Sequence, residues 1–302
     1  MRGAPVAARG DTPLRSFGLV CGLCALLVSG CGCSPGDGAR SAEPGGFVEP
    51  GDCAGGDRGL PIDPRSGEPI CDVGSSPAVF FSAHPDDESI GMAGAILEAR
   101  AAGRLVFIEL MTHGEKSAAR ARLDDGLTDT WHPGIHHHPM SEAAFGEARV
   151  REMRDAAVRL GVTGVVINDF PNGALTRAEV LGRIETWLAR GLPCLSLAGT
   201  AGPQDPTTAG GEPHPDHIAV WDALIASGHP DVRGFLVYDH GHHAGHPNIV
   251  VSIAPYCAQK AFALDAYRVW APQRGRYGVG FHSVRTLIEI AQEDCIELVV
   301  TP

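Results

Sequence analysis

Two short clusters of histidine and aspartate are the residues of this chain whose types and spacing favour chemistry. His84, Asp86 and Asp87 directly follow an apolar run, and the sequence His-Pro-Asp-His recurs far along the chain at residues 214–217. In an open α/β sheet, sites form at the carboxyl ends of strands. One imidazole and one carboxylate from the first cluster, with one imidazole from the second, would give three protein ligands. Catalytic zinc is held by such a set, with the fourth position left for water.

A simpler explanation of the first cluster is that it caps a helix. Asp86 and Asp87 suit the N-cap and first turn of a helix that begins near Glu88, and such caps are common. The second cluster argues against this explanation. Chance rarely places both an HPDDE sequence after a buried-type strand and an HPDH sequence before a helix.

The segment from Ala83 to Glu88, together with residues 214–217, resembles the LmbE-like, or PIG-L-like, zinc-dependent N-deacetylases. The resemblance extends over roughly residues 76–300. It implies one Zn²⁺ per chain, although other divalent metals would fit the same donors. It also implies removal of an acyl group, usually acetyl, from an N-acetylglucosamine-type sugar or glycoconjugate. The expected partner is therefore a small-molecule or glycan substrate.

The resemblance also assigns roles to residues of the two clusters. His84 and Asp87 match the first two metal ligands of the family, and His217 matches the third. Asp86 matches the general base that takes a proton from the attacking water. His214 matches a histidine near the carbonyl oxygen. As an imidazolium it would stabilise the oxyanion and then protonate the leaving amine.

Three residues are candidates for substrate binding. Arg149 matches the arginine of an R-x-x-E segment that contacts the sugar in some members, although a solvated helix arginine is an equally good explanation. Asn172 stands where many members have an aspartate on sugar hydroxyls, which leaves the identity of the sugar open. His113 follows the second expected strand and is expected to line the pocket. Some members also have a tyrosine shortly before the HPDH sequence, and this chain has none there.

Other acidic and histidine residues near the motifs allow two explanations each. Asp216 either orients a ligand histidine or caps the following helix, and Glu88 either caps its own helix or fixes His84. Histidines gather at residues 136–138 and 240–246, where they indicate either a second metal or a polar rim. We favour the rim, because no acidic ligand spacing accompanies these histidines.

Apolar runs and helix-like segments alternate along the chain. We expect strands over residues 79–83, 105–111, 165–167, 194–197, 235–238 and 249–253, and helices over residues 88–102, 141–160, 176–189, 218–227, 258–269 and 284–292. Repeated βαβ units predict an α/β, Rossmann-like fold, with a mostly parallel sheet and helices on both faces. The family resemblance implies the same fold.

The first 75 residues are expected to lie outside this domain, which we place at residues 76–302. Residues 1–30 combine arginines with an apolar run too short to span a membrane, and Val-Ser-Gly-Cys at residues 28–31 looks like a bacterial lipobox. This predicts a lipoprotein signal peptide, a lipid on Cys31, and export to the outer membrane or periplasmic face. The alternative is an ordinary signal peptide. Residues 31–75, rich in glycine and proline, are expected to be a flexible tether.

Charge and cysteine content restrict the partners further. The formal net charge is −12 over 302 residues, and the leader is itself basic. Without a basic patch the chain is a poor partner for nucleic acid, and it would contact membranes only through its lipid. Export would permit disulfides, of which Cys53–Cys71 and Cys257–Cys295 are plausible local pairs among several.

These observations lead to one hypothesis with two rivals. The hypothesis is a zinc-dependent N-deacetylase in which Asp86 is the base. The rivals are a non-catalytic carbohydrate-binding lipoprotein with a vestigial metal site and an amidase that acts on a non-sugar conjugate. Asp86 argues against the first rival, because a pure binder has no use for a base beside the metal. The sequence leaves the N-acyl substrate and the oligomeric state open.

Overall fold

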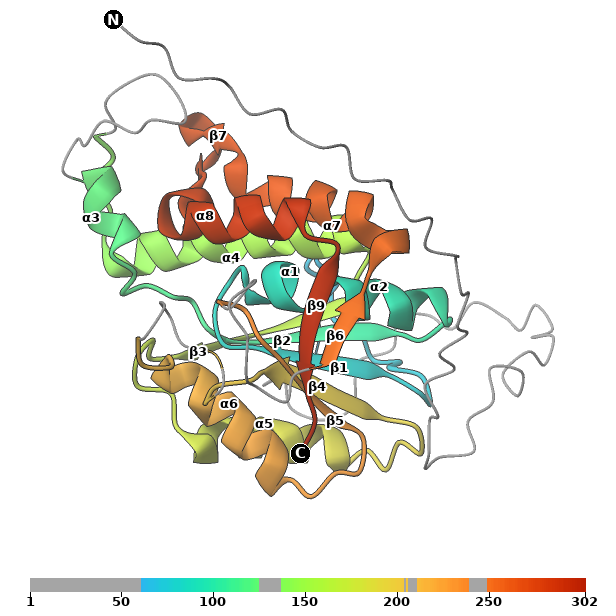
Figure 1. Ribbon diagram of the computed structural model, residues 1–302. Helices are drawn as coiled ribbons and strands as arrows, with labels where there is room; N and C mark the ends of the chain where they lie inside the picture. The colour runs from blue at the N-terminus through green and yellow to red at the C-terminus, as the bar shows by residue number, and fades with distance from the viewer. Residues whose placement is uncertain (1–60, 125–136, 204, 206–210, 239–248) are drawn as a thin grey trace, which may run out of the picture. The chain divides into compact units, whose positions relative to one another are not determined.

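Seven strands form one sheet in the computed structural model, which describes residues 61–124, 137–203, 205, 211–238 and 249–302 (Figure 1). The strand order is β3-β2-β1-β4-β5-β9-β6. The strands are β1 (Ala78–Ser82), β2 (Val106–Thr112), β3 (Gly164–Phe170), β4 (Ser196–Thr200), β5 (Val232–Phe235), β6 (Ile249–Ser252) and β9 (Ile296–Val300). The first five strands pair in parallel, and β9 runs antiparallel between β5 and β6. The expected mostly parallel sheet is confirmed.

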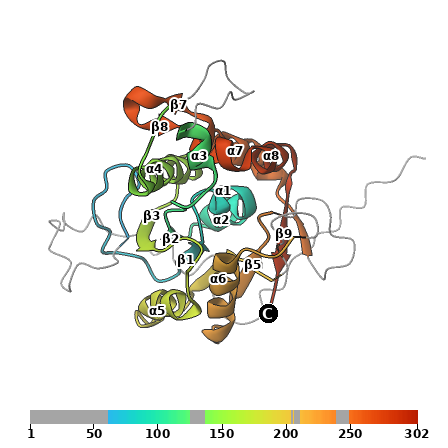
Figure 2. The same ribbon diagram turned by 90° about the vertical axis from the view of Figure 1, so that its left-hand side faces the viewer.

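Helices cover both faces of this sheet (Figure 2). They are α1 (Asp87–Gly91), α2 (Ala93–Ala101), α3 (Ala119–Asp124), α4 (Glu142–Leu160), α5 (Arg177–Leu188), α6 (Pro215–Ala226), α7 (Cys257–Leu264) and α8 (Val279–Glu293). The figure shows α5 and α6 on one face and α1, α2, α4, α7 and α8 on the other. A short ribbon pairs β7 (Trp270–Ala271) with β8 (Arg276–Tyr277). Within the described ranges, no helix has the length and apolar character needed to cross a bilayer.

Strand β1 shows why the first motif follows an uninterrupted apolar run. All five of its residues are buried, because helices cover the sheet on both sides. Val79 and Phe81 belong to the core beneath α5 and α6, whereas Ala78 and Phe80 belong to the core beneath α2 and α4. The strand is therefore held from both faces, and the residues after it start from a fixed position.

Local sequence signals set the start of one helix on each face of the sheet, α4 and α5. Helix α4 begins after Ser141, whose hydroxyl accepts from the Ala144 N–H, and it ends at Gly161 with a φ of 66°. Helix α5 begins with a capping box between Thr176 and Glu179. Both helices match their expected ranges to within one residue.

Several expected elements differ in their bounds from those observed: the helix expected over residues 284–292 begins at Val279, and the one expected over 258–269 ends at Leu264. Two further differences lie beside the site. The helix expected over residues 88–102 is interrupted at Met92, whose φ of −125° and ψ of 0° separate α1 from α2. The strand expected over residues 235–238 instead ends at Phe235. Beyond it, the buried carboxylate of Asp205 accepts from the N–H groups of Val237 and Tyr238, each at 2.8 Å. These two residues therefore leave the strand ladder and turn towards the carboxyl edge of the sheet.

The domain also begins earlier than the composition indicates. Residues 61–75 were expected within the tether, but Ile62 forms an antiparallel bridge with Val165 of the edge strand β3, and Val73 is buried in the core. These apolar side chains give the segment enough buried surface to order it. Residues 1–60, with the predicted signal peptide, Cys31 and Cys53, lie outside the described residues.

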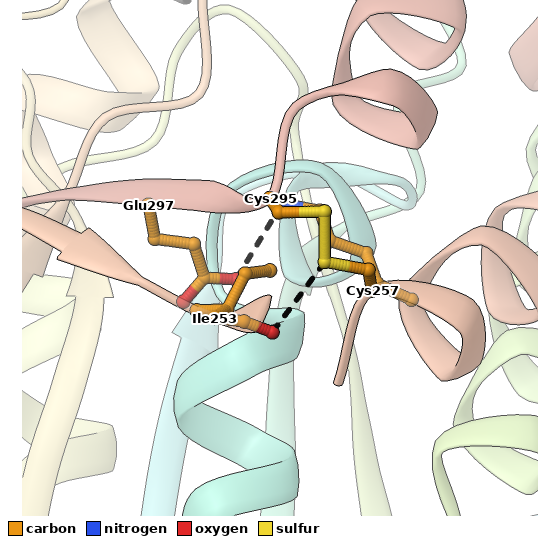
Figure 3. The surroundings of a disulfide bond; sticks show 5 residues. Ile253, Cys257, Cys295 and Glu297 are labelled. Carbon is orange, nitrogen blue, oxygen red and sulfur yellow. Dashed lines mark hydrogen bonds and ion pairs between the residues drawn. A yellow bond between two sulfur atoms is a disulfide. The ribbon is translucent and has the colours of Figure 1, made fainter. Parts of the chain in front are cut away.

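A disulfide fastens the last strand to the helical layer. Cys257 at the start of α7 is bonded to Cys295 just before β9, as expected (Figure 3). Two residues after Cys295, in β9, the side chain of Glu297 is buried and accepts hydrogen bonds from the N–H groups of Gly94 and Ala95, at the start of α2. The close packing here excludes a side chain at Gly94, since an added Cβ would lie 2.2 Å from Ile253. Cys71 and Cys194 each take part in a further disulfide.

Removing this disulfide should destabilise the fold measurably. The bond closes a loop across a sequence separation of 38 residues, and loop-closure entropy of that length corresponds to roughly 3–4 kcal/mol. We expect the double variant Cys257→Ala/Cys295→Ala to lose about that much free energy of unfolding in urea titrations. An unfolding midpoint equal to that of the unaltered protein would show that the bond adds no constraint.

Candidate metal centre and active site

Three donor atoms from the two sequence clusters meet at the carboxyl edge of the sheet. His84 follows β1, Asp87 opens α1, and His217 lies in the first turn of α6, which follows β4 after a loop. Because β1 and β4 are adjacent and parallel, their carboxyl ends lie side by side. The two helices approach this point from opposite faces of the sheet (Figure 2).

The spacing of these donors fits a divalent metal. Asp87 Oδ2 lies 3.4 Å from His84 Nδ1 and 3.2 Å from His217 Nε2, and the two nitrogens are 3.3 Å apart. Ligands about 2.0–2.1 Å from a tetrahedral zinc would lie roughly 3.3 Å from one another. The triangle therefore has the size that zinc requires, with one coordination position left open.

Each histidine of the triangle is oriented by a buried carboxylate behind it. Asp216 Oδ2 lies 3.1 Å from His84 Nε2, and Asp205 Oδ2 lies 3.4 Å from His217 Nδ1. Such carboxylate partners of ligand histidines fix the tautomer and the ring orientation. Of the two explanations for Asp216, the first is confirmed, because its side chain holds His84. The N-cap of α6 is instead His214, whose ring accepts from the Asp216 N–H.

The electrostatics of the triangle favour positive charge. Burial alone would lower the pKa of His217, but the carboxylates of Asp87 and Asp205 outweigh it and raise that pKa to about 10. Burial raises the pKa of Asp87, yet His217 and His84 together bring it well below its usual range. A buried site that stabilises a proton this strongly also stabilises a metal cation in its place.

A second group of donors nearby is less suited to a metal. His84, His214 and Asp216 also bring three donor atoms within 4.8 Å of one another. Both oxygens of Asp216, however, already accept backbone hydrogen bonds, from Gly173 at 2.7 Å and from Leu175 at 3.1 Å. His214 Nδ1 is occupied by the Asp216 N–H. These atoms already accept hydrogen bonds from the loop before α5 and from the start of α6. The triangle of His84, Asp87 and His217 is therefore the better metal site.

Asp86 lies beside the triangle in a strained backbone conformation. It is the one non-glycine residue with a positive φ, 110°, among the described residues. Its N–H donates to Glu88 Oε2, and Glu88 in turn accepts from the Tyr267 hydroxyl. Glu88 therefore supports the N-cap of α1 and does not fix His84. Strain of this kind persists only where the surroundings determine the conformation, as these contacts do.

Arg149 holds the Asp86 side chain and is not a solvated helix arginine. Its guanidinium is buried and donates to Asp86 Oδ2 at 2.9 Å, to the Pro85 carbonyl at 2.7 Å and to the Gly114 carbonyl at 3.0 Å. Burial raises the pKa of Asp86 to about 6, although the charge of Arg149 opposes that rise. The carboxylate thus has a fixed orientation and a pKa near the range that suits a general base.

His214 presents one free nitrogen towards the site. Burial and the neighbouring His84 and His217 lower the pKa of His214 to about 4, so its ring is neutral at pH 7, rather than the imidazolium that the resemblance implies. Since Nδ1 accepts from the Asp216 N–H, the proton of the neutral ring lies on Nε2. His214 can therefore donate one hydrogen bond without carrying a charge.

These residues open onto a single cavity. Its lining side chains are polar or charged except for one valine, and they are His84, Asp86, Lys116, Ser117, Arg149, Asn172, His214, Tyr238, Ser283 and Val284. Two of the three residues expected to bind substrate, Arg149 and Asn172, are thus brought to the site. The third, His113, is not. Its Nδ1 faces the exposed Asp169 at 3.8 Å, outside the lining.

Comparison with known proteins identifies the domain. Residues 79–227 match the family model described as PIG-L: GlcNAc-PI de-N-acetylase. Residues 79–227 are therefore a PIG-L family domain. A comparison with curated proteins gave no match.

Several solved structures are similar to this chain, and one of them, with a TM-score above 0.5, shares its fold. A deacetylase triple mutant of the teicoplanin biosynthetic pathway is 18% identical, with a TM-score of 0.52 over 74% of this chain and 98% of that chain. The N,N'-diacetylchitobiose deacetylase from Pyrococcus horikoshii is 20% identical, with a TM-score of 0.48 over 70% and 75%. The 4-carboxy-2-hydroxymuconate hydratase GalB from Pseudomonas putida KT2440 is 20% identical, with a TM-score of 0.49 over 75% and 97%.

Sequence reasoning missed three residues of the candidate site. Asp205, wholly buried, supports His217, and Tyr238 lines the cavity. Glu115 fixes the substrate-binding candidate Asn172 by accepting from its N–H at 3.0 Å. Only Glu115 had a sequence signal, since it follows the end of an expected strand. The expected histidine clusters at 240–246 and at residue 136 lie outside the described residues.

The support that Asp205 gives to His217 predicts a loss of metal affinity in Asp205→Asn. The carboxylate accepts three N–H groups, and the amide cannot accept all of them because one of its two polar atoms is a donor. We expect metal affinity to fall roughly 10- to 100-fold, measured by competition with a chromophoric chelator. Asp222→Asn, at an exposed position of α6, is the matched control. Equal affinities in the two variants would contradict the assignment.

Proposed function

We propose that this protein is a metal-dependent hydrolase that removes an N-acyl group, usually acetyl, from an N-acetylglucosamine-type sugar or glycoconjugate. The observation that carries the proposal is the position of Asp86. Its carboxylate faces the same cavity as His84 and His214 and is held there by a buried arginine and a strained backbone. A protein that only binds carbohydrate has no use for a base at that place. The description of the family as a de-N-acetylase supports the same reaction.

His84, Asp87 and His217 would hold the metal, and zinc suits them best. Two imidazoles and one carboxylate with an open position are a donor set of catalytic zinc sites. A bound divalent metal supplies a Lewis acid that polarises the acyl carbonyl and lowers the pKa of a water molecule. The protein contributes the rest of the chemistry through residues around that position.

Asp86 transfers the proton in this reaction, and His214 supplies a hydrogen bond. Asp86 Oδ2 is engaged by Arg149, which leaves Oδ1 to take a proton from the attacking water. The Nε2–H of His214 donates to the substrate on the same cavity wall. One water is consumed, the acyl C–N bond breaks, and a carboxylic acid and a free amine are released. Asp86 then gives the proton that it took from water to the nitrogen of the leaving amine.

The cavity lining supports a polar substrate with a short acyl group. Hydroxyls, amides and charged groups surround it, and they match the many hydroxyls of a sugar ring. Among the described residues only Val284 offers an apolar wall, which is too little surface for a long acyl chain. Lys116 at the mouth is exposed and free to meet solvent-facing parts of a glycoconjugate.

Substitution of the base tests this proposal. In Asp86→Asn we expect free-amine release from N-acetylglucosamine compounds to fall about 10²- to 10⁴-fold, since the amide cannot take the proton. Metal content should stay at one per chain. The assay uses protein lacking residues 1–30 and reconstituted with zinc, and Asp222→Asn is the control for a lost surface charge.

Other outcomes separate the rival functions. Undiminished turnover in Asp86→Asn would remove Asp86 from the mechanism. If the unaltered protein binds one metal but releases no amine from any sugar, a binding protein or a non-sugar amidase becomes the better explanation.

A further inference from the structure

Tyr238 enters the site from a strand end that neither sequence cluster contains. Strand β5 stops at Phe235, and the N–H groups of Val237 and Tyr238 both donate to the buried carboxylate of Asp205. The same carboxylate faces His217 Nδ1 at 3.4 Å. One buried side chain therefore fixes the backbone of Tyr238 and the orientation of a metal-site histidine relative to each other.

The ring of Tyr238 is fixed as well as its backbone. It stacks on the His217 ring, with centroids 5.2 Å apart and planes inclined by 23°. A tyrosine side chain has only two rotatable bonds before the ring, so this contact and the anchored backbone together define where the hydroxyl lies. Tyr238 lines the cavity together with His84, Asp86 and His214.

The hydroxyl of Tyr238 has no hydrogen-bond partner within the part of the chain that the structure describes. Tyr267 provides the contrast, because its hydroxyl donates to Glu88. Tyrosine hydroxyls in sheltered positions usually find a partner. A fixed hydroxyl that faces a polar cavity without one is available to a ligand.

We propose that Tyr238 is a catalytic residue whose hydroxyl donates a hydrogen bond to the acyl carbonyl oxygen of the bound substrate. The proposal rests on the proposed deacylation. When water adds to the carbonyl carbon, the π-electron pair moves onto that oxygen and returns as the C–N bond breaks. A donor directed at the oxygen is worth most while the negative charge is present. Tyr238 keeps its own proton throughout.

The position of Tyr238 provides the site with a hydroxyl donor, although no tyrosine precedes the second motif. Residues 211–213 are Gly-Glu-Pro and supply no hydroxyl. The chain beyond β5, which is two strands from β1 in the sheet order, supplies a tyrosine that stacks on His217. Together with the Nε2–H of His214 the cavity then holds two hydrogen-bond donors from different elements.

Tyr238→Phe tests the proposal, because it keeps the stacked ring and removes only the hydroxyl. In the zinc-reconstituted protein we expect kcat to fall about 10²- to 10³-fold. KM should change less than about threefold, because the hydrogen bond strengthens mainly in the transition state. Metal content and unfolding temperature should stay unchanged. Tyr256→Phe, at the end of a short 3₁₀ segment away from the cavity lining, is the matched control.

A binding measurement gives a readout that does not depend on turnover. We expect Tyr238→Phe to weaken binding of a phosphonamide analogue of the tetrahedral adduct about 100-fold, while glucosamine, the product amine, binds as before. Equal binding of the analogue by both proteins would overturn the proposal. So would a rise in KM with kcat unchanged, which would indicate a contact that is equally strong in the ground state and the transition state.

Amine release by the unaltered protein distinguishes failure of the role of Tyr238 from failure of the proposed deacylation. If the unaltered protein releases amine and Tyr238→Phe does so at the same rate, only the role of Tyr238 is overturned. If the unaltered protein releases none, the deacylation itself is overturned, and the role of Tyr238 with it.

Discussion

An excess of buried negative charge is the constraint on which the rest of this site depends. Four carboxylates, those of Asp86, Asp87, Asp205 and Asp216, are buried in the described part of the site, and Arg149 pairs with one of them, Asp86. Burying unpaired carboxylates is unfavourable unless hydrogen bonds or cations stabilise their charge. Backbone N–H groups and two histidines stabilise part of that charge here. A divalent cation among the three donors would offset the remainder, so that metal binding and the local fold would support each other.

The helix α4 connects the base to the wall of the cavity. Arg149 on this helix holds Asp86, and Glu152, one turn later, accepts from the N–H groups of Val279 and Gly280 at 2.8 and 2.9 Å. Those two residues open α8, which supplies Ser283 to the cavity lining. The R-x-x-E spacing thus has a physical reason. Arginine and glutamate one turn apart lie on the same face of the helix, where one orients the base and the other fixes the helix that borders the substrate.

The sequence predicted the parts of this structure that depend on local pattern. Strand β1 was predictable because both its faces are buried, and the two motifs were recognisable because their residue types are unusual directly after a strand and before a helix. Strand β9 was missed because Glu297, a charged residue, interrupts its apolar run, and its partners at Gly94 and Lys260 are distant in sequence. A charged residue in a strand is explained only by contacts that the fold creates.

The supporting residues of the site were unpredictable for a related reason. Asp205 lies in a loop rich in glycine, proline and threonine, a composition typical of solvent-exposed segments, yet it is wholly buried. Its three N–H partners come from His217 and from the chain beyond β5, which meet only at the sheet edge. The same contact ended β5 early and moved Tyr238 into the cavity. Periodicity and spacing describe one segment at a time, so they cannot reveal a side chain that joins two.

The position of the bound metal tests this account most directly. A zinc-loaded crystal, measured above and below the zinc absorption edge, would locate the ion by anomalous difference density. The account predicts one peak per chain, about 2.0–2.2 Å from His84 Nδ1, Asp87 Oδ2 and His217 Nε2. A peak instead between His84, His214 and Asp216, the other group of donors within reach, would contradict it, as would the absence of a peak at either place.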